Sequence, residues 1–426
     1  MSWKLILIIL LFAAISISPR LDIGQLETGR IVQLRYEDFI LVLIVILLFF
    51  HSSIMKKKEF YITPLFKPIL VYIVLATIST CIGIIASWIV PAMAFFFFLK
   101  EIEYFLIFFV VANLIKTYNE LRIAIYSLLF CAIANGFYIL YQVSTDRFAG
   151  GSYGAGSIGE RGTFPTAGYL TIVFLLSISI FIVTKGKVMK LVSLVSVVVC
   201  GIGILSTGSR ANLLGSLFSL SILLFFIIRE SFKTKNYAHF VYTTLIILVM
   251  FVTFDRAFNY ALEKRPALNR LTNIQGMKSS FFETRVESIY VVVLNEVKKN
   301  PFFGLGKTAS TTVLGGTGAA HNYYLRILVE MGIVGLMFFL YLLLSIIRMS
   351  LELNRNSQSN LGKAIGLGCL LAIFSLMFAS IAQDAFIPVK VNETFWALVG
   401  LGAAAYSIEF SKGSDEPLPH KIEGIS

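Results

Sequence analysis

The chain has 426 residues, of which 57% are hydrophobic and only 14% are charged, and its mean hydropathy is +0.83. Soluble domains carry about 25% charged residues, so this composition excludes an ordinary water-soluble enzyme. The formal net charge of +12 does not indicate nucleic-acid binding, because the lysines and arginines are scattered between apolar stretches. The four cysteines fall inside apolar stretches, none at metal-ligand spacing, and are therefore expected to be packing residues.

Apolar runs of about 20 residues, the length that crosses a bilayer, recur along nearly the whole chain. The first run begins after Lys4 and resembles a signal peptide, but it lacks a small-residue cleavage site before Pro19, so we expect it to remain as a helix. The sequence thus predicts a single polytopic membrane domain over residues 1–426, an all-α integral membrane protein with about twelve transmembrane helices. These are expected near residues 3–18, 39–54, 66–90, 92–115, 121–143, 165–184, 188–206, 211–228, 239–254, 323–347, 364–383 and 394–410.

Positive charge is distributed unequally between the two sets of connections. With the N-terminus inside, the inner connections carry Lys56, Lys57, Lys58, Lys67, Lys116, Arg122, Lys185, Lys187, Lys190, Arg229, Lys233, Lys235, Arg348, Arg355 and Lys363. The outer connections carry Arg20, Arg30, Arg35, Arg147, Arg161, Arg210 and Lys390. The positive-inside rule therefore predicts that both termini are cytoplasmic, in a multi-pass protein of the bacterial inner (cytoplasmic) membrane.

The long loop over residues 255–321 falls on the outer side. Within it, residues 283–300 place apolar side chains on one helical face and end at Pro301, which predicts an amphipathic helix on the bundle or the membrane surface. Glycines at 304, 306, 315, 316 and 318 then give a flexible approach to the next helix. A second glycine-rich outer loop spans residues 149–162.

That second loop contains the pattern G-x-G-x-x-G at Gly154, Gly156 and Gly159. In dinucleotide-binding proteins this pattern follows a strand within a βαβ unit, and no such unit is expected here. We interpret these glycines as loop residues only.

The outer ends of the helices carry three arginines and one histidine, namely Arg161, Arg210, Arg285 and His321. Any one of these arginines could simply anchor a helix end at headgroup level. Together they favour an anionic ligand, because guanidinium groups bind phosphate oxygens bidentately. Arg285 also lies near the start of its predicted helix, where the helix dipole favours an anion. A bound diphosphate would satisfy both requirements.

His321 is the only one of the four histidines expected at the outer face. A neutral imidazole can accept a proton near physiological pH, as a general base that acts on a hydroxyl must. The alternative is that His321 is a polar residue that caps the following helix.

Several of these segments resemble the O-antigen ligase and polymerase family of bacterial envelope glycosyltransferases. The family's ligases have His followed by Asn, Ser or Gln, then nine residues, then Gly-x-x and a small residue or Tyr, and His321, Asn322, Gly332 and Gly335 match this spacing. The segments NPFFGLG at 300–306 and TGSRANLLG at 207–215 also resemble blocks of that family. The resemblance covers residues 160–345, with one departure at PTAG (165–168), where family members often have Asn after the Pro.

This resemblance implies a bundle of the GT-C kind and a glycan donor carried on undecaprenyl diphosphate. It implies transfer to an acceptor hydroxyl with inversion and without a metal or other cofactor. The acceptor would be a lipid A core sugar for a ligase, or another lipid-linked glycan for a polymerase. Carried over to this sequence, Arg210 and Arg285 would bind the diphosphate, His321 would activate the hydroxyl, and Arg161 and Asn322 would contact substrate.

Two other interpretations stay open. Acidic residues in the first outer loop, Asp22, Glu27, Glu37 and Asp38, could ligate a catalytic metal, although acids beside Arg30 and Arg35 more often form a solvated, salt-bridged loop. Lys100, Glu101 and Glu103 lie within an apolar run, and charges inside a membrane suggest function. They could form the ion or proton relay of a transporter, or they could simply pair with one another inside the bundle.

Overall fold

The computed structural model describes residues 2–25, 31–55, 62–145, 147, 156–159, 162–234, 289–314 and 320–410. Before the long loop, the helices are α1 (Trp3–Ile17), α2 (Tyr36–Met55), α3 (Phe66–Ile85), α4 (Pro91–Leu114), α5 (Tyr118–Thr145), α6 (Thr163–Val183), α7 (Lys187–Thr207) and α8 (Arg210–Thr234). Within the long loop lie α11 (Val291–Val297) and α12 (Ala309–Val313), and after it come α13 (Tyr323–Asn356), α14 (Asn360–Ala379) and α15 (Val389–Phe410). Two short strands, β1 (Arg20–Gln25) and β2 (Ile31–Arg35), pair antiparallel. The all-α prediction is confirmed.

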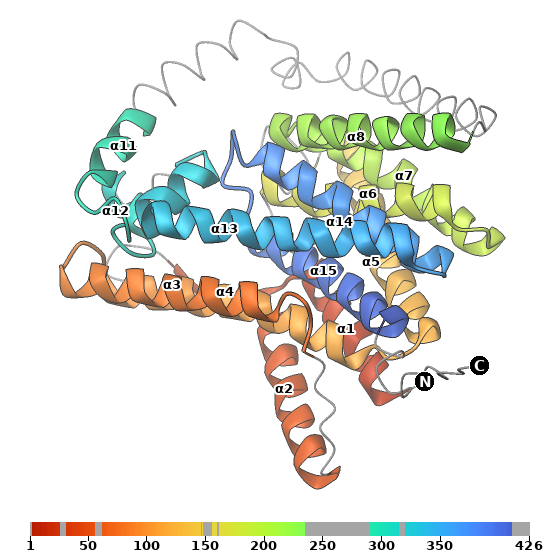
Figure 1. The fold of residues 1–426 in the computed structure, drawn as a ribbon, viewed down its shortest axis with the longest axis horizontal. Coiled ribbons are helices and arrows are strands. Elements are labelled where there is room, and N and C mark those ends of the chain that lie inside the picture. The colour runs from red at the N-terminus through yellow and green to blue at the C-terminus, as the bar shows by residue number, and fades with distance from the viewer. Residues whose placement is uncertain are drawn as a thin grey trace, which may run out of the picture.

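The long helices run side by side in one bundle, with α3 and α4 along one side, α8 along the opposite side, and α13 and α14 between them (Figure 1). Seven described helices are long and apolar enough to cross a membrane: α3, α5, α6, α7, α8, α13 and α14. In the apolar window of α6, 83% of the residues are buried, against 33% in α8. Helix α6 therefore belongs to the protein core, whereas much of α8 is left for lipid.

Helices α4 and α15 are 24 and 22 residues long but carry charges within their length. Lys100, Glu101 and Glu103 lie in α4, and Lys390 and Glu393 lie in α15. Since charged groups are costly in lipid, they are expected to face the bundle interior. All five side chains are buried or half-buried, and those of Lys390 and Glu393 are fully buried.

The described helices follow the predicted runs closely, whereas the run at 239–254 lies outside the described residues, as do most of the loops at 149–162 and 255–321. The loop between α1 and α2 differs from the sequence expectation, because β1 and β2 form an antiparallel ribbon in which Arg20 lies opposite Arg35. Helix α2 then points away from the bundle (Figure 1) and exposes large apolar side chains, among them Val42 and Phe50. Such a face is compatible with lipid rather than with water.

The predicted amphipathic helix at 283–300 is described from residue 289 onward. There, α11 buries Val293 fully and packs Ile289 and Val297 against a small cluster that includes Leu305 and Val329. Ile289, Val293 and Val297 thus face inward as the sequence predicts, whereas Leu294 of the same predicted face is 45% exposed, and α11 ends before Pro301.

The orientation in the membrane can be tested by cysteine labelling. Lys298, after α11, and Gln358, between α13 and α14, are both exposed. In a variant that lacks the four native cysteines, Lys298→Cys is expected to react with an impermeant maleimide added outside intact cells, and Gln358→Cys only after permeabilisation. Labelling of both cysteines from one side would contradict the charge-based topology.

Candidate active site

The starts of α6 and α8 and the end of α14 meet at one end of the bundle. The side chain of Asn212, in the first turn of α8, donates a hydrogen bond to the backbone oxygen of Phe164 in α6, at 3.2 Å. Farther along α8, Phe218 stacks on Phe378 at the end of α14, with ring centroids 4.8 Å apart. Arg210, the first residue of α8, is half-buried at this end.

His321 lies at the same end. The backbone N–H of Tyr323, the first residue of α13, donates to the carbonyl oxygen of Ser380, directly after α14, at 2.9 Å. Arg210 and the pair His321–Asn322, the three sequence-predicted site residues that the structure describes, are therefore brought to one end of the bundle from segments more than a hundred positions apart.

The conformation of His321 is unusual for a residue other than glycine. Its φ is +50°, in the left-handed region, and such a backbone persists only where the surroundings impose it. Its Nδ1 lies 3.3 Å from Oε1 of Gln383. A neutral imidazole that donates from Nδ1 to this oxygen keeps its lone pair on Nε2, where it can accept a proton.

The cap of α13 is Asn322 rather than His321. The side-chain oxygen of Asn322 accepts hydrogen bonds from the N–H groups of Tyr324 and Leu325, at 3.0 and 3.1 Å. The capping role considered for His321 therefore belongs to its neighbour. Substrate contact by Asn322 stays a prediction.

Helix α13 is broken at Gly332, whose φ of 67° and ψ of −170° are not helical. A break frees backbone groups that a continuous helix would pair. The carbonyl oxygens of Val329 and Glu330 instead accept hydrogen bonds from the N–H groups of Leu305 and Gly306, at 2.8 and 2.9 Å. The segment at 301–306, within the long loop, thus takes the place of the missing helical turn.

The same segment also bonds to the residues that follow Gly332. The N–H group of Ile333 donates to the carbonyl oxygen of Pro301 at 2.9 Å, and a Cβ on Gly304 would lie 2.5 Å from backbone atoms of Glu330. Only a residue without a side chain permits this approach. The NPFFGLG segment and the glycine of the histidine motif therefore form one structural unit.

A cavity of about 430 Å³ lies beside this unit, among β2, α3, α4, α13 and α15. Its walls include Tyr72, Tyr104, Phe386 and Trp396. Its charged lining residues are the cations Arg35, Lys100, Lys307 and Arg326 and the carboxylates Asp38, Glu101, Glu103 and Glu330. Cations and carboxylates are equal in number, so the lining is nearly neutral overall. It combines aromatic faces with many hydrogen-bonding groups.

Arg326 connects the cavity with the loop after α14, which contacts His321. Its guanidinium pairs with Glu330 at 3.0 Å, one turn farther along α13, and with Asp384 at 3.6 Å. All three side chains are buried. Burial raises the pKa of Asp384, and the guanidinium of Arg326 opposes this rise. Asp384 follows Gln383 directly, so one short loop contacts both the histidine and the cavity.

Lys307 directly follows the segment that fills the break in α13. It is 6% exposed, and its Nζ lies 2.9 Å from Glu101 of α4 and 4.0 Å from Glu330. The hydroxyl of Tyr72 also donates to Glu101, at 3.0 Å. The break in α13 thus positions a buried ammonium between two carboxylates of the cavity.

The three charges of α4 are all paired. Lys100 lies 2.7 Å from Glu103, the pairing expected inside a bundle, and also 2.6 Å from Asp38 at the start of α2. Glu101 pairs with Lys307. These contacts agree with the pairing interpretation, while the transporter interpretation is not tested by them.

The expectation of a solvated acidic loop is wrong for two of its four residues. Asp22 is exposed and accepts from Gln33, but Glu37 is fully buried and accepts from Ser18 at 2.6 Å. Asp38 faces the cavity and pairs with Lys100. The reason is that α2 begins at the bundle wall, where its first turn packs inward. Glu27 lies outside the described residues.

Arg161 and Arg285 also lie outside the described residues, so their roles stay predictions. Sequence reasoning missed Lys307, Arg326, Glu330 and Asp384. A signal was present for two of them, since an arginine and a glutamate four residues apart inside an apolar run indicate a buried ion pair. No comparable signal marked the other two, whose partners come from distant segments.

Comparison with known proteins supports the resemblance. The sequence model of a family described as O-antigen ligase matches residues 195–340. The matched residues include Arg210, the segment at 301–306 that fills the break in α13, His321 and Gly332. The resemblance to the O-antigen ligase and polymerase family is therefore confirmed over this part of the chain. No curated protein matches the sequence.

Proposed function

We propose that this membrane protein transfers a glycan from undecaprenyl diphosphate to an acceptor hydroxyl at the outer face of the inner membrane. The family match supports an O-antigen ligase or polymerase type of activity in general. The finer assignment rests on the site residues and on the resemblance. The acceptor is a lipid A core sugar in the ligase form of the proposal and a second lipid-linked glycan in the polymerase form.

The chemical step is an inverting displacement at the anomeric carbon of the donor. The acceptor oxygen forms the new glycosidic bond, while the bond from the anomeric carbon to the phosphate oxygen breaks. Undecaprenyl diphosphate leaves with the electron pair, and Nε2 of His321 takes the hydroxyl proton. The observation that carries this proposal is the contact of Nδ1 with Gln383, which supports the tautomer whose Nε2 accepts a proton.

The leaving diphosphate is assigned to the arginines. Arg210 stands at the start of α8, where the backbone N–H groups of a first helical turn also favour an anion. Arg285 is placed with it as the second diphosphate ligand, and Arg161 as a further donor contact, on the resemblance alone. Fixed guanidinium groups can stabilise the developing charge without a metal ion.

The proposal is tested with the purified full-length protein in lipid nanodiscs, given a lipid-linked glycan donor and acceptor. At low temperature, polymer or ligated product is expected to form at an unchanged rate in excess EDTA, because no proposed step uses a metal. Loss of product in EDTA and its recovery with Mg²⁺ would contradict the arginine assignment. Absence of product together with donor movement across sealed vesicles would instead favour the transporter.

A further inference from the structure

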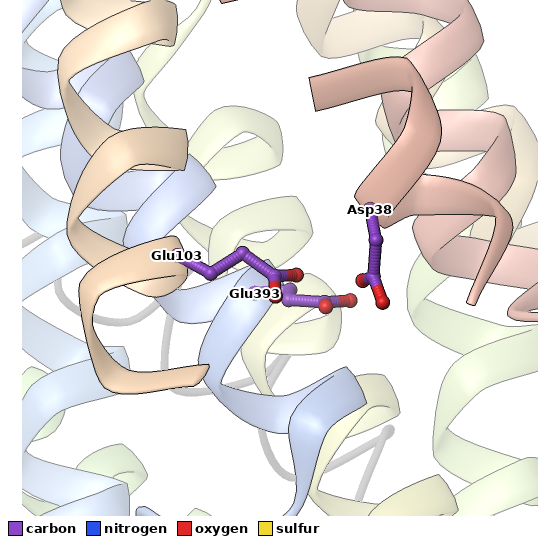
Figure 2. A group of neighbouring side chains, drawn as sticks. All are labelled: Asp38, Glu103 and Glu393. Atoms are coloured by element: carbon purple, nitrogen blue, oxygen red, sulfur yellow. The ribbon is translucent and has the colours of Figure 1, made fainter. Parts of the chain in front are cut away.

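Three carboxylates from distant segments converge beside the cavity. They are Asp38 at the start of α2, Glu103 in α4 and Glu393 in α15, and one oxygen of each lies within 4.8 Å of those of the other two. Figure 2 shows all three side chains pointing toward one another from their separate helices. None of the residues of the proposed transfer chemistry is among them.

Lys100 already pairs with two of the three carboxylates. The ammonium of Lys100 lies 2.6 Å from Asp38 and 2.7 Å from Glu103. Glu393 is different, because its side chain is 0% exposed and no described residue donates a hydrogen bond to either of its oxygens. Its carboxylate points into the cluster (Figure 2).

The charges at this place do not balance. The three carboxylates carry three negative charges, and the ammonium of Lys100 contributes one positive charge. The neighbouring ion pair of Arg35 and Glu37, 3.8 Å apart, is neutral and does not change this net charge. Two negative charges are therefore in excess in a buried region, where uncompensated charge is strongly unfavourable. Either a cation or bound protons must compensate them.

We propose that Asp38, Glu103 and Glu393 bind a hard divalent cation, Ca²⁺ or Mg²⁺. Such a cation balances the two excess charges, and carboxylate oxygens are the ligands that these ions prefer. Histidine and cysteine, which softer transition metals favour, are not part of this cluster among the described residues. Asp38 and Glu103 line the cavity, so the ion has a route of entry and water can complete its coordination.

The cation would connect the first turn of α2 to α4 and α15. Its role is therefore structural, and it is independent of the transfer reaction. In EDTA, transfer measured at low temperature is expected to continue while resistance to heat declines. The two proposals can thus fail separately.

The test is thermal unfolding of the full-length protein after removal of metals with EDTA and desalting. CaCl₂ or MgCl₂ is expected to raise the unfolding temperature by several degrees and to saturate, as ligand binding to the native state requires. NaCl of equal ionic strength should give no such shift. Equilibrium dialysis should find one bound ion per chain.

Glu393→Gln is expected to abolish both the shift and the bound ion. Glu101→Gln is the matched control, since it removes a cavity carboxylate that pairs with Lys307 outside the cluster, and its cation-induced shift should persist. Asp38→Asn provides a second cluster variant if Glu393→Gln does not fold. No shift in the wild type, or an equal shift in Glu393→Gln, would overturn the proposal and leave bound protons as the compensating charge.

Discussion

Replacing His321 with alanine is expected to lower the rate of glycan transfer by about 10²–10⁴-fold, the usual contribution of a general base. The histidine side chain contacts Gln383 at a moderate 3.3 Å, and the cap of α13 is supplied by Asn322. Its removal should therefore spare the fold. The rate is measured with lipid-linked donor in nanodiscs, and the unfolding temperature is measured on the same preparation.

A histidine elsewhere in the chain provides the control. His51 lies in α2, a helix separate from the segments that contain His321 and its contact Gln383, and His51→Ala should retain nearly full activity. Activity of His321→Ala within a few-fold of the wild type, with normal accumulation, would show that the imidazole does not act as the base.

Replacing Gly332 with alanine is expected to destabilise the protein strongly. Its φ of 67° and ψ of −170° lie in a region that is essentially restricted to glycine, and occupying it with another residue costs about 1–3 kcal/mol. The added Cβ would also lie 2.2 Å from the carbonyl oxygen of Phe302. Forcing additional atoms into a packed region costs a further amount of about 1–3 kcal/mol. Thermal unfolding in detergent measures the combined loss.

Gly186→Ala is the matched control. A Cβ at Gly186 would have no heavy atom within 4 Å, and the residue has an ordinary extended backbone before α7. Its unfolding temperature should stay close to that of the wild type. Equal unfolding temperatures for the two variants would show that the break in α13 is not held by the packing described above.

The helices could be predicted because each is specified locally. A run of apolar residues bounded by charges or proline requires no knowledge of the rest of the chain. The start of α13 could likewise be predicted from the sequence, because Asn322 is a typical helix cap and an apolar stretch follows it. The same local reasoning found the histidine motif, because its residues are close in sequence.

The cavity could not be predicted in this way, because its members meet only in the folded chain. Glu101 and Lys307 are separated by 206 positions, and their pairing depends on how α4 packs beside the break in α13. Glu393 lies three residues after Lys390 at the start of an apolar run, and its neighbours Asp38 and Glu103 come from two other helices. Such contacts have no periodicity that a single sequence displays.

The insertion of residues 301–306 into α13 also limits how the chain can be altered. Four backbone hydrogen bonds fix this segment in register with residues 329–334, from Leu305 to Val329, Gly306 to Glu330, Ile333 to Pro301 and Val334 to Phe302. Lengthening or shortening the segment by a single residue would shift every one of these partners and move Lys307 out of the cavity. An affinity tag or reporter is therefore better introduced beside the exposed Lys298, which precedes the registered stretch, than anywhere between Pro301 and Gly306.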